Sequence, residues 1–107
     1  MYTAVADAID RVESDPGLRV LFLTGTADCF TSGNDMVDFM QNPPSGGGSP
    51  VMRFLNGIRS MTKPLVAAVS GPAVGVGTTL LLHCDLAYAG RGAKFQMPFV
   101  SLGLCPE

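Results

Sequence analysis

The chain has 107 residues, of which 47% are hydrophobic, and a formal net charge of −2. This length allows at most one domain, and the seven basic residues are scattered singly, so neither nucleic acid nor a membrane surface is expected as a partner. Acidic and basic residues interrupt the first turns, and no apolar run of about 18 residues exists, so neither a signal peptide nor a membrane span is expected.

The sequence has few cysteine and histidine side chains that could form a metal site or a disulfide. Cys29, Cys84 and Cys105 are odd in number and have no C-x-x-C spacing, and His83 is the single histidine. We therefore expect no metal site, with the thiols acting as small buried apolar residues in a reducing compartment. His83 is interpreted as a structural histidine rather than a catalytic one.

The first half of the chain predicts two amphipathic helices and a strand. A helix is expected over 2–14, with its apolar face formed by Val5, Ala8, Ile9 and Val12. The apolar run 19–24 predicts a strand buried on both faces. A short helix over 35–40, a flexible connection over 42–50 and a second helix over 51–61, with Met52, Leu55 and Ile58 inward, follow.

The second half predicts a strand over 64–69, a glycine turn over 71–77 and a buried helix over 76–83. Strands over 85–89 and 94–96 and a turn at 98–99 come next. The alternation of helices and strands indicates an α/β fold with largely parallel pairing.

Two apolar strands each lead into a glycine turn, at Ser32–Asp35 and at Gly71–Gly77. A dinucleotide fingerprint would need a third glycine where Leu80 stands, so nucleotide binding is disfavoured. Two such turns can instead direct two backbone N–H groups at one oxygen, as in an oxyanion hole. The alternatives are structural: Asp35 caps a helix and Gly33 adopts a positive φ, while Thr78 or Thr79 caps the buried helix and Asp85 anchors the next strand.

Three segments together carry a family resemblance: Phe30–Asp35, Lys63–Gly77 and Cys84–Ala89. In order and spacing they resemble the crotonase (enoyl-CoA hydratase/isomerase) superfamily. The resemblance implies a ββα spiral that binds acyl-CoA thioesters, of which 1–107 would be a central portion without the opening strands and the C-terminal helical region. It also implies that the thioester carbonyl lies between the backbone N–H groups of Asn34 and Val76. The remaining substrate-binding residues it implies are Ser32, Gly33, Asp35, Met36 and Gly75.

The resemblance also indicates which reaction is catalysed on the bound thioester. The hydratase pattern has two glutamates where this chain has Thr79 and Phe99, whereas Glu107 is placed as in the Δ3,Δ2-enoyl-CoA isomerases, where one glutamate is the catalytic base. Met97, Phe99 and Leu102 would then form an apolar acyl pocket. A weak hydratase and an inert binding module remain as alternatives.

Further expectations concern the setting of the enzyme. No cofactor is expected beyond the coenzyme A of the substrate. Family members form trimers or hexamers, which implies a homo-oligomer, and they work in the bacterial cytoplasm or in peroxisomes.

Overall fold

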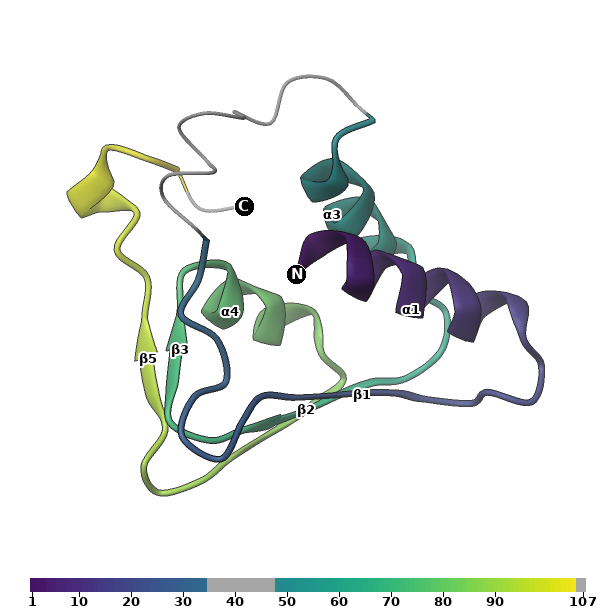
Figure 1. The fold of residues 1–107 in the computed structure, drawn as a ribbon, viewed down its shortest axis with the longest axis horizontal. Helices are drawn as coiled ribbons and strands as arrows, with labels where there is room; N and C mark the ends of the chain where they lie inside the picture. Colours follow the sequence, from purple (N-terminus) through teal and green to yellow (C-terminus); the bar gives the residue numbers. More distant parts are fainter. Residues whose placement is uncertain (35–47, 106–107) are drawn as a thin grey trace. The chain divides into compact units, whose positions relative to one another are not determined.

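The computed structural model describes residues 1–34 and 48–105, and these form two compact units. The first unit comprises residues 1–21 and 48–65, and the second comprises residues 22–34 and 66–105. Figure 1 shows the helices α1 and α3, which belong to the first unit, and the short helix α4, which belongs with strands to the second. The predicted helix over 35–40 lies outside the described residues, as does most of the connection 42–50.

In the first unit, α1 (Tyr2–Ser14) packs against α3 (Pro50–Ser60). Both predicted helices are confirmed within one residue of their expected ends. Ser49 caps α3, because its side chain accepts a hydrogen bond from the Met52 N–H at 3.2 Å, and Pro50 suits the first helical position. Apolar side chains from the two helices make the core between them: Ala6, Ile9, Val12, Phe54 and Ile58.

Polar contacts also stabilise the first unit. Arg53 forms ion pairs with Asp7, at 2.7 Å, and with Asp10. The Lys63 ammonium donates to three carbonyl oxygens at and after the C-terminal end of α1, those of Val12, Asp15 and Leu18. A cation at this end also interacts favourably with the helix dipole, so Lys63 stabilises the end of α1.

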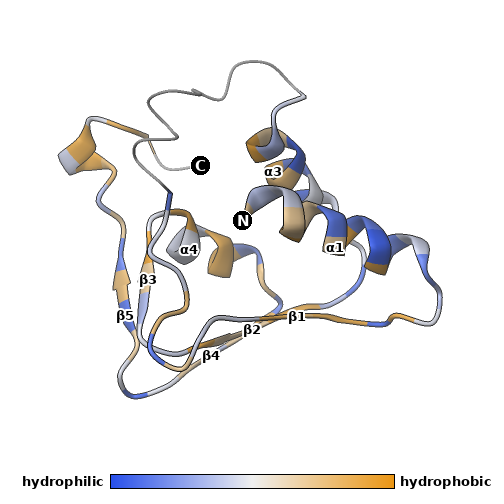
Figure 2. Ribbon diagram, viewed as in Figure 1, coloured by the Kyte–Doolittle hydropathy of each residue, from blue (hydrophilic) through white to orange (hydrophobic). Residues whose placement is uncertain are grey.

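Two small sheets lie mainly in the second unit. The first has the strand order β1 (Leu21–Thr24), β2 (Leu65–Val69), β4 (Leu86–Ala89), and the second pairs β3 (Pro72–Val74) with β5 (Lys94–Gln96). The β2–β4 and β3–β5 pairs are both parallel, which confirms the expected parallel pairing. Figure 2 colours β1 and β2 mainly as apolar, while α1 carries both polar and apolar residues.

The burial of these strands differs from the prediction in one respect. In β2, Leu65, Ala67 and Val69 are buried, but β1 alternates between half-buried and exposed residues, and Phe22 is 55% exposed. The expectation that 19–24 is buried on both faces is therefore wrong for this chain. Among the residues that the structure describes, nothing covers the face of β1 that carries Phe22.

The expected buried helix over 76–83 is divided in the structure. It consists of α4 (Val76–Thr79) followed by the 3-10 helix η1 (Leu80–His83). Val76, Thr79 and Leu80 are buried, but Leu82 is 79% exposed and His83 is exposed too. The prediction of an entirely buried helix was wrong, because the apolar residues at its C-terminal end have no covering element among the residues described.

Candidate acyl-thioester site

Three parallel segments of the second unit bring most of the predicted site residues to one edge. Thr31 forms a parallel bridge with Ala73 in β3, and β3 pairs with β5 on its other side (Figure 1). In parallel segments the carboxyl ends meet at the same edge. The residues that follow these ends are Ser32–Asn34, Gly75–Val76 and Met97–Phe99.

The first arm of this edge is the turn after Thr31. Gly33 has a φ of 91°, and its N–H donates to the Thr31 Oγ1 at 3.2 Å, which confirms the expected left-handed glycine. A Cβ atom at Gly33 would lie 3.0 Å from the Val74 carbonyl oxygen, so only glycine lets the turn approach β3 this closely. Asn34, which carries one of the predicted N–H donors, is half-buried, and Ser32 is exposed.

The second arm is the turn between β3 and α4. Gly75 has a φ of 57°, and its N–H donates to the Gln96 carbonyl oxygen at 2.8 Å. The Gly75 carbonyl oxygen accepts from the N–H groups of Thr78 and Thr79, at 2.8 and 3.1 Å, and this starts the helix. Val76 is then the first residue of α4, and the N–H groups of a first helical turn have no intrahelical acceptor.

The two threonines at the start of α4 do not cap it. The helix has no side-chain cap, so the capping prediction was wrong. The Thr78 hydroxyl donates to the Ala73 carbonyl oxygen at 2.5 Å and lies 3.3 Å from that of Gln96, which ties α4 to both strands beneath it. The Thr79 hydroxyl is buried and donates to the Val76 carbonyl oxygen at 3.4 Å. A threonine hydroxyl does not ionise near neutral pH, so position 79 offers no proton-transfer group.

The apolar residues expected at an acyl pocket follow β5. Phe99 is 8% exposed, whereas Met97 and Leu102 are 53% and 47% exposed. Leu102 lies in the 3-10 helix η2 (Val100–Leu102), which begins after the predicted turn at 98–99. Of the three side chains expected in the acyl pocket, Phe99 is thus buried, while Met97 and Leu102 are exposed.

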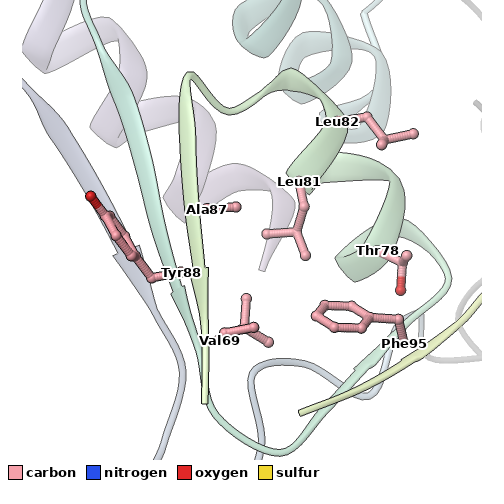
Figure 3. Close-up of a pocket in the computed structure, with 8 residues that line it drawn as sticks. Val69, Thr78, Leu81, Leu82, Ala87, Tyr88 and Phe95 are labelled. Atoms are coloured by element: carbon pink, nitrogen blue, oxygen red, sulfur yellow. The ribbon is translucent and has the colours of Figure 1, made fainter. Parts of the chain in front are cut away.

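A cavity of 320 Å³ was not anticipated from the sequence, and it lies elsewhere in the second unit. Figure 3 shows side chains of β2, β4, η1 and β5 around it, with Leu81 and Phe95 turned toward Val69. Its lining is Val69, Thr78, Leu81, Leu82, Ala87, Tyr88, Ala89 and Phe95, and includes none of the predicted site residues. Little in the sequence indicated this cavity, because the lining residues come from separate parts of the chain.

The three cysteines form no disulfide in the part of the chain that the structure describes. Cys29 and Cys84 are half-buried and Cys105 is exposed, and all three are free. The prediction of buried cysteines is wrong for Cys105, which follows the exposed residues after η2. Burial raises the pKa of the Cys84 thiol, and the negative charge of Asp85 adds to this effect, so Cys84 is a poor nucleophile at neutral pH.

Three residues of the predicted site, Asp35, Met36 and Glu107, lie outside the described residues. Within the part of the chain that is described, no cluster of His, Cys, Asp or Glu could hold a metal ion. No helix of that part is both long enough and apolar enough to cross a membrane.

Comparison with known proteins identifies the family. The family described as Enoyl-CoA hydratase/isomerase matches residues 1–107. The chain belongs to this family.

The relatives of this chain are named as enzymes of two kinds, hydratases and isomerases. Enoyl-CoA hydratase EchA19 of Mycobacterium tuberculosis is 39% identical over 113 residues, covering 99% of this chain and 42% of its own length. Human enoyl-CoA delta isomerase 2 is 37% identical over 114 residues, covering 100% of this chain and 29% of its own length.

A solved structure confirms the crotonase-like α/β fold. The structure of Pseudomonas aeruginosa OdaA has 54% sequence identity and a TM-score of 0.94, and the match covers 100% of this chain and 43% of that one. The chain thus spans less than half the length of each of these relatives.

Proposed function

We propose that the protein isomerises 3-enoyl-CoA to 2-enoyl-CoA. The observation that carries this proposal is the buried Thr79, whose hydroxyl donates to a carbonyl of its own helix. In the hydratases of the superfamily that this sequence resembles, two glutamates add water to the substrate. Thr79 and Phe99 stand at the positions of those glutamates in this chain. Neither side chain here transfers protons, which favours a reaction that needs a single base.

The thioester carbonyl is proposed to accept hydrogen bonds from the N–H groups of Asn34 and Val76. Support comes from the parallel segments that place the two glycine turns at one edge. Both turns approach the backbone of a neighbouring segment closely, which suits a site made of main-chain donors. Donors of this kind stabilise the charge of a developing enolate, and each is worth about 3–4 kcal/mol in the transition state.

Glu107 is proposed as the base. It takes a proton from C2, which gives a dienolate whose charge lies largely on the thioester oxygen, and then returns the proton to C4. One carboxylate suffices because the reaction moves a proton and adds nothing. Met97, Phe99 and Leu102 would exclude water from the acyl chain and so suppress hydration. This role of Glu107 comes from the family resemblance.

The other elements of the proposal concern binding and setting. Ser32, Gly33, Asp35, Met36 and Gly75 are proposed to contact the substrate. A proton transfer changes no oxidation state, so coenzyme A is needed only as part of the substrate. A homotrimer or hexamer in a bacterial cytoplasm, or in peroxisomes of a eukaryote, is proposed on the family resemblance.

The test is an assay of the whole protein with a 3-enoyl-CoA, in which the absorbance of the conjugated product measures the rate. Glu107→Gln should lower the rate about 10²–10⁴-fold, the range of general-base catalysis. The other glutamate, Glu13, contacts Thr62 and Lys63, so Glu13→Gln is a matched control that should keep the rate at a temperature well below unfolding. Addition of water to crotonyl-CoA that persists in Glu107→Gln would instead indicate a hydratase.

A further inference from the structure

We propose that Thr31 is the positioning residue that holds the two carbonyl-binding turns in register with each other. The inference rests on the proposed function, because the N–H groups it positions are those of Asn34 and Val76. Thr31 touches neither the substrate nor the base in this proposal. It acts through three separate contacts, each to a different part of the edge.

The backbone of Thr31 fixes the strand that leads to the second turn. The Val74 N–H donates to the Thr31 carbonyl oxygen at 3.0 Å, and the Thr31 N–H donates to the Pro72 carbonyl oxygen at 3.2 Å. Val74 directly precedes Gly75 and Val76. The position of the second donor is therefore set relative to Thr31.

The hydroxyl of Thr31 fixes the first turn. Its Oγ1 accepts a hydrogen bond from the Gly33 N–H at 3.2 Å, in a half-buried setting. This bond spans the step at which Gly33 adopts its positive φ, and Asn34 follows directly. Loss of the acceptor would leave the direction of the Asn34 N–H less restricted.

The methyl group of Thr31 packs on the helix that carries the second donor. A Cβ atom at Gly77 would lie 2.0 Å from the Thr31 Cγ2, so the methyl group occupies the space beside the first turn of α4. Rotation about χ1 would move the methyl group away from Gly77, but it would also take Oγ1 away from the Gly33 N–H. Only threonine carries both groups, since serine lacks the methyl and valine lacks the hydroxyl.

The experiment separates the hydroxyl from the methyl in the whole protein. Thr31→Val keeps the branched shape and removes the hydroxyl, whereas Thr31→Ser keeps the hydroxyl. The matched control is Thr26→Val, because the Thr26 hydroxyl also bonds a nearby turn, at Cys29. The probe is butanoyl-CoA labelled with carbon-13 at the thioester carbonyl, whose stretching frequency falls when the oxygen accepts hydrogen bonds.

We expect wild type and Thr26→Val to lower this frequency equally, Thr31→Val to lose much of the shift, and Thr31→Ser to retain most of it. The kcat of Thr31→Val should fall about tenfold with little change in KM, less than the 10²–10³-fold loss for removal of an oxyanion donor. A wild-type shift that Thr31→Val keeps in full, with an unchanged kcat, would overturn the role of Thr31. If wild type binds the probe without a shift, the proposed carbonyl site itself is wrong.

Discussion

Gly77 provides the most discriminating perturbation of the proposed site. Substitution by alanine adds one methyl group at the first turn of α4, and that group would lie 2.0 Å from the Thr31 Cγ2. Non-bonded carbon atoms are normally about 3.5–4.0 Å apart, so the contact must open by about 1.5 Å. Either α4 moves away from the Thr31 segment or the Thr31 side chain rotates and releases the Gly33 N–H.

Both responses displace a proposed N–H donor. A misplacement of about 1 Å in a catalytic arrangement costs about 10²-fold in rate, so kcat/KM of Gly77→Ala should fall by about this factor. This corresponds to about 2.7 kcal/mol of transition-state stabilisation. Stability should suffer less, because alanine favours a helix over glycine by up to about 1 kcal/mol.

The double variant tests whether the clash is the cause. Thr31→Ser removes Cγ2, after which the nearest atoms to the new methyl group are the Cβ and carbonyl oxygen of residue 31, at 3.4 and 3.7 Å. Steady-state kinetics with a 3-enoyl-CoA should therefore place the double variant within about tenfold of Thr31→Ser alone. A double variant as slow as Gly77→Ala would refute this reasoning.

Two further predictions concern the first unit. Phe54 is 1% exposed, and its ring centroid lies 5.2 Å from that of Tyr2. Phe54→Ala should therefore lower the free energy of unfolding, measured by urea denaturation, by about 3–5 kcal/mol. Asn56 is exposed on the same helix, so the control Asn56→Ala should change this free energy by less than about 0.5 kcal/mol. Hydrogen bonds from the Thr62 hydroxyl, and then from the N–H groups of Thr62 and Lys63, lower the pKa of Glu13. The ionised Glu13 carboxylate therefore stabilises the fold above the ordinary glutamate pKa of about 4.3. This stabilisation is lost as the pH falls through the lower pKa of the folded state. The stability difference between wild type and Glu13→Gln should shrink below about pH 4, and a difference independent of pH would contradict this.

Local patterns predicted the longer elements well. The helices α1 and α3 repeat apolar residues at helical spacing, and β2 is a continuous apolar run with a buried face. The strand β3 was missed, since Pro72 between Gly71 and Gly75 is typical of a turn. It becomes a strand through its pairing with Thr31 and β5, which the sequence does not display.

The candidate site could be predicted in part. Gly33 and Gly75 both have the positive φ that favours glycine, and the strand-to-turn pattern indicated where the chain would bend. The role of Thr31 was not visible, because its contacts with Val74 and Gly77 join residues far apart in the chain. The burial of β1 and of η1 was overestimated because neighbouring elements, rather than local hydropathy, determine which faces are covered.

The central claim is that the backbone N–H groups of Asn34 and Val76 hold one thioester oxygen. A crystal structure of the whole protein with butanoyl-CoA, which lacks the double bond and does not react, tests it most directly. The account predicts that the thioester oxygen lies within about 2.7–3.1 Å of both nitrogen atoms. A bound thioester whose oxygen contacts neither nitrogen would contradict it.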